Sequence, residues 1–248
     1  MDGIIIVNKP QGWTSFDVVA KIRSLTKVKK VGHSGTLDPI ATGVLPVFLG
    51  RATKFIKYFM EGDKGYETEM VLGARTDSGD STGKFQTSNL KPQNEIIIPN
   101  FQTVKKALEK YRGEIEQTPP MFSAVKVNGQ RLYELARKGI EVERKPRRIN
   151  IYKLEITSSE AELVDSRRVE FYVECSKGTY VRQLVMDIGD DLGCGAYLTK
   201  ISRVYSHPFR LSQAHDLEAI ITLQKIGQLA SIVIDPYEVL QAMGKKPA

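Results

Sequence analysis

The sequence predicts an α+β fold with a mixed, mostly antiparallel central sheet flanked by helices. Segments with the two-residue alternation of strands and segments with the 3.6-residue spacing of helices both occur along the chain. They follow one another without the regular strand–helix–strand rhythm that a parallel sheet requires. With 248 residues and 41% apolar content, the chain is long enough to bury a substantial core.

The first strand and helix are expected near the N-terminus. Residues 3–9, GIIIVNK, form an apolar run of strand length that closes at a Pro-Gly turn, which predicts a buried strand. In residues 14–25, apolar side chains recur at helical spacing. Thr14 and Asp17 have the spacing of a capping box, so the helix is expected to begin just after Thr14.

Two further elements are expected before the middle of the chain. Residues 66–72 alternate between the two faces of a strand, with Tyr66 on the inner face and Glu67 and Glu69 on the other. Residues 103–111 carry apolar side chains at i, i+3, i+4 and i+7, which predicts an amphipathic helix.

The clearest strand–turn–helix signal lies at residues 168–195. Alternating apolar residues from Val169 predict a strand, the sequence SKGT predicts a turn, and apolar residues from Val181 predict a helix that ends at Gly193. Arg182 falls in the first turn of that helix, off its apolar stripe and near the positive end of the helix dipole. A cation there does not stabilise the helix, so it is better placed to hold an anion from another part of the fold.

The dipeptide Asp-Pro occurs twice, in different settings. Asp235 has the local context of a helix N-cap, with proline at the first helical position and a glycine after the last apolar residue. Asp38 is also expected to cap a short helical turn. It lies among three glycines, however, and His33 precedes it by five residues. Glycines at this density indicate unusual backbone conformations or close approach of a ligand.

Three chemical interpretations compete for the stretch KVGHSGTLDPIATGVLP, residues 30–46. A Walker-type phosphate loop is disfavoured because no lysine follows Gly43. A serine hydrolase with Ser34 as nucleophile is disfavoured because the elbow motif needs glycine where Thr36 stands. An ionised Asp38 acting as nucleophile or acid–base group, with Arg182 as a candidate partner, is the third. From these residues alone, a catalytic Asp38 and a simple helix cap stay open.

The charge distribution favours a polyanionic partner. The formal net charge is +7, and most of this excess falls in residues 119–148, which hold eight basic and three acidic side chains. Clustered lysine and arginine gain affinity for RNA or DNA through counterion release. A solvated basic surface is the alternative.

Other composition features exclude several protein classes. No apolar run approaches the length needed to span a bilayer, and the N-terminus lacks the pattern of a signal peptide. Cys175 and Cys194 have no further ligands at metal-binding spacing, so we expect buried thiols in a reducing cytoplasm and no zinc site.

Five sequence blocks, in order from about residue 3 to 210, together resemble the tRNA pseudouridine synthase B family. They are VNKPQGWTSFDVV, KVGHSGTLDPIATGVLPVFLGRATKF, GARTDSGDSTG, GEIEQTPPMFSAVKVNGQRLYELARKGIEV and CSKGTYVRQLVMDIGDDLGCGAYLTKISR. The resemblance implies the pseudouridine synthase fold. It also implies isomerisation of the uridine at position 55 in the tRNA T-loop, with no metal and no organic cofactor.

The resemblance also implies catalytic roles. Asp38 would be the nucleophile and Arg182 its ionic partner. Tyr66 would stack on the target uracil, and its hydroxyl would be available for proton transfer. Because the reacting atoms are inaccessible in a stacked loop, the uridine would have to be flipped out.

Further residues are implied to bind the substrate. Tyr180 and Ile201 would line the uracil pocket, and His33 would enter the T-loop where the flipped base had been. Asp77 and Asp80 are expected to shape their loop as Asx turns. The expected phosphate contacts are Lys54, Lys126, Arg131, Arg137, Arg144, Lys145, Arg147 and Arg148.

The expected organisation is a single catalytic domain over residues 1–248, with an RNA-gripping insertion around 119–148 and no C-terminal RNA-binding PUA domain. The expected partner is the T-arm of tRNA, for a monomeric protein without an obligate protein partner or membrane attachment. Two other functions compete with this one. One is a tRNA-binding folding chaperone with little catalysis, and the other is a guide-RNA-dependent relative in a larger particle.

Overall fold

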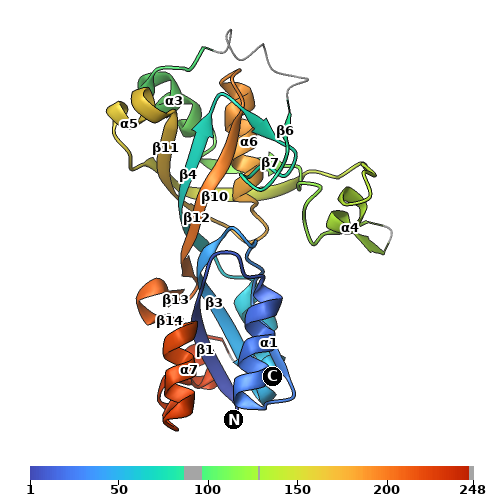
Figure 1. Cartoon of the computed structure of the whole chain (residues 1–248), viewed down its shortest axis with the longest axis vertical. Helices are drawn as coiled ribbons and strands as arrows, with labels where there is room; N and C mark the ends of the chain where they lie inside the picture. Colours follow the sequence, from blue (N-terminus) through green and yellow to red (C-terminus); the bar gives the residue numbers. More distant parts are fainter. Residues whose placement is uncertain (87–96, 128, 246–248) are drawn as a thin grey trace. The chain divides into compact units, whose positions relative to one another are not determined.

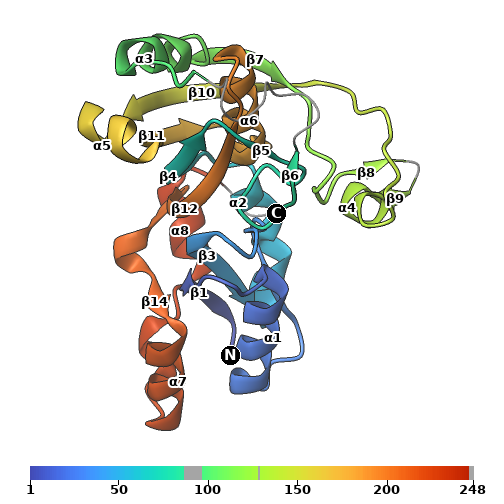
Figure 2. The ribbon, with the colours of Figure 1, turned by 45° about the horizontal axis from the view of Figure 1, so that its top comes forward.

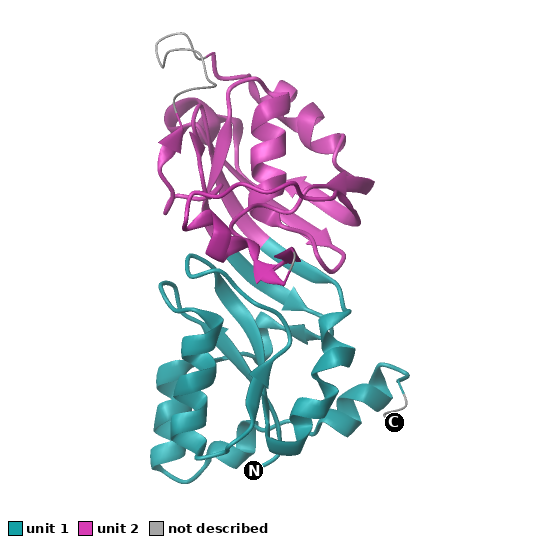
Figure 3. Cartoon of the chain, turned by 90° about the vertical axis from the view of Figure 1, so that its right-hand side faces the viewer, with its two compact units in different colours: residues 1–66, 201–248 teal, residues 67–200 magenta. Residues whose placement is uncertain are grey.

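The computed structural model of the chain describes residues 1–86, 97–127 and 129–245 (Figure 1). Internal contacts divide the chain into two compact units (Figure 3). Unit 1 comprises residues 1–66 and 201–248, and unit 2 comprises residues 67–200. Two strands, β4 (Lys64–Leu72) and β12 (Ala196–Ser206), have residues in both units. The single catalytic domain expected from the sequence stays a prediction.

Unit 1 is built on a sheet in the order β14-β1-β3-β12, with β2 paired to β3 and β13 paired to β12. Its remaining strands are β1 (Gly3–Lys9), β2 (Val31–His33), β3 (Thr42–Leu49), β13 (Phe209–Arg210) and β14 (His215–Asp216). Its α-helices are α1 (Ser15–Thr26), α2 (Ile56–Met60), α7 (Leu217–Lys225) and α8 (Pro236–Ala242). Its 3-10 helices are η1 (Gly50–Phe55), η3 (Leu211–Gln213) and η4 (Leu229–Ile232).

Strand β1 is buried on both faces, which explains its unbroken apolar sequence. One face, with Ile4 and Ile6, joins an aromatic-rich core that includes Phe48 and Phe59, whose ring centroids are 5.1 Å apart. Ile5 and Val7 on the other face are also fully buried. Helix α1 begins as predicted: Thr14 and Asp17 form the expected capping box. Strand β1 ends beside α1, and the connection between them positions part of the candidate site.

Unit 2 carries the strand order β12-β4-β11-β10-β7 and two separate strand pairs, β5-β6 and β8-β9. Its other strands are β5 (Arg75–Thr76), β6 (Phe85–Gln86), β7 (Gly113–Gln117), β8 (Lys126–Val127), β9 (Gln130–Arg131), β10 (Arg147–Ile156) and β11 (Arg168–Cys175). Its helices are α3 (Phe101–Glu109), α4 (Leu132–Ala136), α5 (Glu160–Ser166) and α6 (Val181–Asp191). The predicted strand–turn–helix of this unit is confirmed as β11 and α6.

The predicted fold class is confirmed. Strand β1 pairs antiparallel with β3, and β10 pairs antiparallel with both β7 and β11. Parallel pairing occurs between β1 and β14 and between β3 and β12, so the sheet is mixed and mostly antiparallel. Helices flank the strands in each unit (Figure 1).

Two local predictions need refinement. Helix α3 ends at Glu109, so Tyr111 lies beyond the helix whose apolar stripe it was expected to complete. On β4, Glu67 is exposed, but Glu69 is buried. A carboxylate tolerates that burial because Lys200 Nζ lies 2.7 Å from it and the Thr199 hydroxyl donates a 2.6 Å hydrogen bond.

Candidate active site

Asp38 lies on a tight turn between β2 and β3. The backbone N–H of Ala41 donates to the Asp38 carbonyl at 3.0 Å, and no helix follows. The expected helical turn is therefore a single hydrogen-bonded turn, for which proline at the second position is favourable. The side chain of Asp38 is half-buried. At the other Asp-Pro, the carboxylate of Asp235 caps α8 by accepting from the Tyr237 N–H at 2.8 Å, as predicted.

The connection between β1 and α1 holds the Asp38 turn in place. The Gly12 N–H donates to the Pro39 carbonyl at 2.8 Å. The Ser15 hydroxyl accepts from the Leu37 N–H at 2.8 Å and lies 3.2 Å from the Leu37 carbonyl, to which it donates. Both residues that flank Asp38 are thus fixed from the same side. We call residues 10–16 the clamp segment.

A buried lysine reinforces this arrangement. Lys9 is fully buried, and its ammonium donates to the carbonyls of Pro10 at 2.9 Å, Trp13 at 2.6 Å and Pro39 at 3.4 Å. Burial lowers the pKa of Lys9 to about 8, while the negative charge of Asp38 acts in the opposite direction. Sequence reasoning missed Lys9, although a lysine that closes a buried apolar strand was a usable signal.

A second buried cation, Arg203 on β12, braces the glycine-rich stretch. Its guanidinium donates to the Val44 carbonyl at 2.8 Å and to the Gly35 carbonyl at 3.1 Å. Gly43 has φ +100°, and a Cβ there would lie 2.3 Å from the Arg203 carbonyl oxygen. Glycine is therefore required at position 43 for both conformation and space.

The side chain of His33 is half-buried, and its surroundings favour the neutral imidazole. Its Nδ1 accepts from the Gly35 N–H at 3.2 Å, which leaves the ring proton on Nε2. Burial, with the nearby charge of Arg203, lowers the pKa of His33. The neighbouring Ser34 hydroxyl is buried and has no hydrogen-bond partner among the described residues. A serine hydroxyl needs a hydrogen-bonded base to become nucleophilic, so this geometry does not support a hydrolase.

Tyr66 and Ile201 lie in unit 1 on β4 and β12, the two strands that have residues in both units. Tyr66 is the third residue of β4 and is 9% exposed, on the inner face as predicted. Ile201 is half-buried on β12. Unit 1 therefore holds Asp38, His33, Tyr66 and Ile201.

Arg182 is held rigidly in unit 2. It is the second residue of α6 and is 4% exposed, so it is not a surface arginine. Its guanidinium donates to the carbonyls of Ser78 at 2.7 Å and Phe122 at 2.8 Å, and its Nε lies 3.7 Å from the Asp80 carboxylate. The pairing of Arg182 with Asp38 stays a prediction.

The loop that carries Asp80 has the predicted character. Asp80 Oδ1 accepts from the Thr82 N–H at 2.9 Å, which is the Asx-turn hydrogen bond, and from two side-chain hydroxyls. The Asx turn predicted at Asp77 is not what the structure shows: Asp77 Oδ1 accepts from the Lys84 N–H at 2.8 Å, seven residues further along, and so closes the loop. The sequence did not predict that the Asp80 carboxylate would also lie beside the Arg182 guanidinium.

Tyr180 is the N-cap residue of α6 and is half-buried. The side chain of Gln117 brackets its backbone: the amide oxygen accepts from the Tyr180 N–H at 2.8 Å, and the amide nitrogen donates to the Tyr180 carbonyl at 3.1 Å. Gln117 on β7 is 2% exposed. This buried glutamine, which sequence reasoning also missed, fixes the start of the helix that carries Arg182.

The predicted phosphate contacts lie in both units. Lys54 is exposed on η1 in unit 1, where its ammonium lies 4.7 Å from the centre of the Phe55 ring. The others belong to the expected insertion of unit 2, part of which stands away from the sheet around α4 (Figures 1 and 2). Exposed side chains there are Lys126, Arg131, Arg137, Lys145, Arg147 and Arg148.

Arg144 differs from the other basic residues of the insertion. Its guanidinium donates to the Pro119 carbonyl at 3.2 Å and pairs with Glu141 at 3.1 Å. Its side chain is only 21% exposed. These contacts tie the two ends of the insertion together, so Arg144 has a structural role that the exposed cations lack.

Two features are absent from the part of the chain that the structure describes: a group of side chains able to hold a metal ion, and a helix able to span a membrane. Within residues 1–86, 97–127 and 129–245, no group of three or more His, Cys, Asp or Glu side chains could hold a metal ion. In that same part of the chain, no helix combines the length and apolar character of a membrane span.

Comparison with known proteins identifies the family of the chain. Residues 23–181 match the family described as TruB family pseudouridylate synthase (N terminal domain). The chain is 49% identical over 218 residues to tRNA pseudouridine synthase B of Clostridium acetobutylicum, covering 88% of this chain and 72% of that protein. It is 45% identical over 235 residues to tRNA pseudouridine synthase B of Francisella philomiragia, covering 94% and 75%.

A solved structure shares the fold. A chain in the crystal structure of a Cbf5-Nop10-Gar1 complex superposes with a TM-score of 0.72 at 28% identity, covering 96% of this chain and 61% of that chain. The family match extends over more than half of the sequence, and the sequence relatives are aligned over most of their length. The chain therefore belongs to the TruB family of pseudouridylate synthases.

Proposed function

We propose that this protein is an isomerase that converts the uridine at position 55 in the T-loop of tRNA to pseudouridine. The observation that carries the proposal is the Asp38 turn. Its half-buried carboxylate is held from one side by the clamp segment, in a chain 49% identical to a tRNA pseudouridine synthase B. A fixed, accessible carboxylate is the group that covalent catalysis at an electrophilic carbon requires.

The reaction rearranges bonds without adding or removing atoms. The N1–C1′ bond of uridine breaks, the uracil turns, and C5 bonds to C1′; C5 then loses its proton and N1 gains one. Asp38 would form the covalent link that retains the substrate during this turn. We expect Arg182 to keep the Asp38 carboxylate ionised.

The remaining residues have roles in holding the flipped base. Tyr66 would stack on the uracil, with Tyr180 and Ile201 completing the pocket. His33 would fill the space that the base leaves in the T-loop. The neutral, half-buried imidazole of His33 suits insertion among bases, because a permanent charge there would have to be desolvated.

The RNA grip is proposed to come from the exposed cations of the insertion and from Lys54. Exposed lysine and arginine side chains on a protruding segment can neutralise phosphates without giving up buried interactions. Arg144 contributes indirectly, by fixing the insertion through Pro119.

The proposal is tested by replacing Asp38 with asparagine. Asp38→Asn keeps the shape and the turn but removes the nucleophile. Tritium release from 5-tritiated uridine in an unmodified tRNA transcript should disappear, while tRNA binding should persist. Retained turnover would refute the mechanism. Wild-type protein that binds tRNA but releases no tritium would instead point to the chaperone function.

We further propose that the protein acts as a monomer in a reducing cytoplasm. Both cysteines are free and buried, and burial raises the pKa of the Cys194 thiol, which makes it unreactive. Among the described residues, the large exposed apolar side chains belong to several different elements. Light scattering during size-exclusion chromatography, with and without tRNA, would test the monomer.

A further inference from the structure

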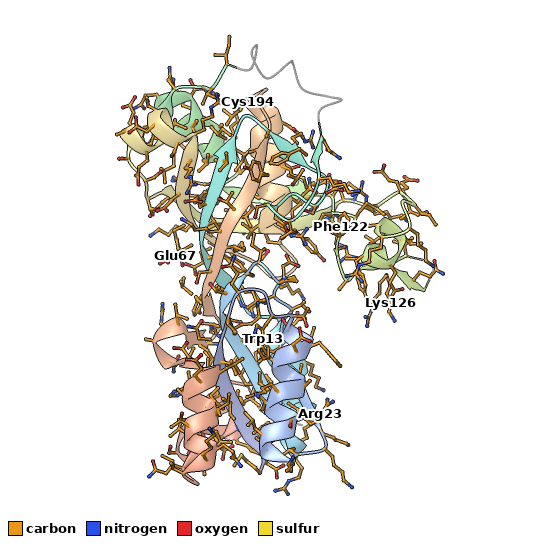
Figure 4. All side chains as sticks on the ribbon, in the orientation of Figure 1. Trp13, Arg23, Glu67, Phe122, Lys126 and Cys194 are labelled. Atoms are coloured by element: carbon orange, nitrogen blue, oxygen red, sulfur yellow. The ribbon has the colours of Figure 1, made fainter. Side chains whose placement is uncertain are left out.

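Two large aromatic side chains are exposed on the clamp segment. Trp13 is 37% exposed and Phe16 is 68% exposed. Trp13 lies just before the start of α1 (Figure 4), and Phe16 is the second residue of that helix. Single exposed apolar side chains are common on protein surfaces, whereas exposed aromatic residues close to a proposed site are candidates for binding a ligand. The chemistry proposed above uses neither residue.

Both aromatic residues are fixed relative to Asp38. The Trp13 carbonyl accepts from Lys9 Nζ at 2.6 Å, and the same ammonium contacts the Pro39 carbonyl at 3.4 Å. Ser15, between the two aromatics, exchanges two hydrogen bonds with the backbone of Leu37. The clamp segment and the Asp38 turn thus form one hydrogen-bonded assembly, so the backbone that carries both aromatics is fixed relative to the backbone of the proposed nucleophile.

Capping of helix α1 gives a structural role to Trp13 but not to Phe16. With Thr14 as the N-cap of α1, Trp13 and Val18 occupy the two positions of a hydrophobic staple. That role explains why Trp13 is partly covered. It does not explain Phe16, which stands at the second helical position with two thirds of its surface in solvent.

We propose that Trp13, together with Phe16, forms a stacking platform for an unpaired base of the RNA substrate close to the target uridine. This inference rests on the proposed function. Every base offers a π-face to an aromatic ring, and unpaired loop bases are the RNA groups that proteins stack upon. The platform would anchor the loop while the target uridine leaves the stack.

The sequence provides a direct reporter, because Trp13 is the only tryptophan in the chain. The full chain carrying Asp38→Asn is titrated with an unmodified tRNA transcript, and tryptophan emission is recorded alongside filter binding. Base stacking should quench the emission with the same midpoint as binding. Unchanged emission at saturating tRNA would overturn the inference and would leave the platform to another occupant, such as a protein.

Substitutions at position 13 separate stacking from capping. Trp13→Leu keeps an apolar staple but cannot stack, whereas Trp13→Phe keeps a stacking ring. Trp13→Leu should raise KM for tRNA about tenfold with kcat and Tm unchanged, and Trp13→Phe should stay near wild type. Phe16→Ala, which has no staple role, should raise KM in the same direction.

The two proposals fail in distinguishable ways. A wild-type KM for Trp13→Leu would refute the stacking platform while tritium release still supported the isomerase. A lower kcat without a change in KM would also refute it, because a platform that binds the loop acts on affinity. Absence of tritium release from wild-type protein would instead refute the proposed function.

Discussion

Replacing Lys9 by methionine perturbs the clamp at its buried centre. The lysine ammonium is fully buried and donates to three carbonyls, including Trp13 at 2.6 Å and Pro10 at 2.9 Å. Methionine preserves the length and apolar stem of the side chain but provides no donor. The substitution therefore removes the hydrogen bonds and the charge with little change in volume.

The expected loss of stability at neutral pH is small because two large terms oppose each other. Hydrogen bonds from a charged donor contribute about 1.5–3 kcal/mol each, so the two short bonds contribute about 3–6 kcal/mol. Burial lowers the pKa of Lys9 from 10.5 to about 8, so charging Lys9 costs about 3.4 kcal/mol more in the folded protein. The net destabilisation expected for Lys9→Met is therefore about 0 to 3 kcal/mol, with a midpoint of about 1 kcal/mol.

The pH dependence gives a sharper test than the absolute value. Between about pH 8 and 10.5 the unfolded chain binds the Lys9 proton more tightly than the folded protein, so the free energy of unfolding rises with pH. Lys9→Met lacks this contribution. The stability difference between wild type and Lys9→Met should therefore widen by about 2 kcal/mol from about pH 7.5 to about pH 9.5.

Urea unfolding curves at several pH values measure this difference directly. Lys29→Met, which replaces an exposed lysine of the same unit, is the matched control and should follow the wild-type pH profile. A constant difference between wild type and Lys9→Met over the whole range would refute the reasoning. It would mean that the carbonyls compensate the ammonium for burial, so that its pKa stays near the ordinary value.

Three further substitutions test other parts of the structure. Arg182→Lys cannot maintain both carbonyl bonds of the guanidinium, so unfolding should need about 2 kcal/mol less and tritium release should fall about 100-fold. Gly43→Ala places a Cβ against the Arg203 carbonyl and should lower the free energy of unfolding by more than about 2 kcal/mol in urea titrations. In binding titrations at several salt concentrations, Arg147→Glu with Arg148→Glu should weaken tRNA binding. The slope of log affinity against log salt is negative, and its magnitude should decrease by about 0.9 for each phosphate that these side chains no longer neutralise.

Matched variants make these outcomes interpretable. Gly178→Ala also substitutes a glycine at positive φ, but its Cβ would meet nothing within 4 Å, so it should destabilise the protein less than Gly43→Ala. Lys106→Glu changes an exposed charge on α3, outside the insertion, and should leave the salt slope unchanged. Equal effects within either pair would contradict the corresponding explanation.

The sequence predicts those features of the fold that depend on near neighbours in the chain. The capping box at Thr14, the N-cap at Asp235 and the β11–α6 pair were all visible as short-range patterns, and all are present. Burial of Glu69 was not predictable from its strand, because the groups that compensate its charge come from β12. Alternation identifies the two faces of a strand but does not show which partners cover them.

The residues of the candidate site also fall into two groups, those that a local sequence motif identifies and those that it does not. The motif around Asp38, the proposed nucleophile, is contiguous in sequence, so its residues can be named before the structure is known. The groups that hold it are not contiguous: Arg203 reaches Gly35 from 168 residues away, and Gln117 brackets Tyr180 from 63 residues away. Each brace is a single polar side chain on a strand far away in the sequence, and its partners are backbone atoms, which leave no pattern in the side-chain sequence.

The two Asp-Pro dipeptides show how strongly the role of an aspartate depends on the few residues that follow it. After Asp235, apolar residues at helical spacing allow the carboxylate to cap α8. After Asp38 the chain enters β3 at Thr42, and Gly43 within that strand takes a positive φ. No helix forms there, so the half-buried Asp38 carboxylate does not cap an α-helix. The same dipeptide thus caps a helix at Asp235, whereas at Asp38 buried Lys9 and the clamp segment hold the backbone of a turn.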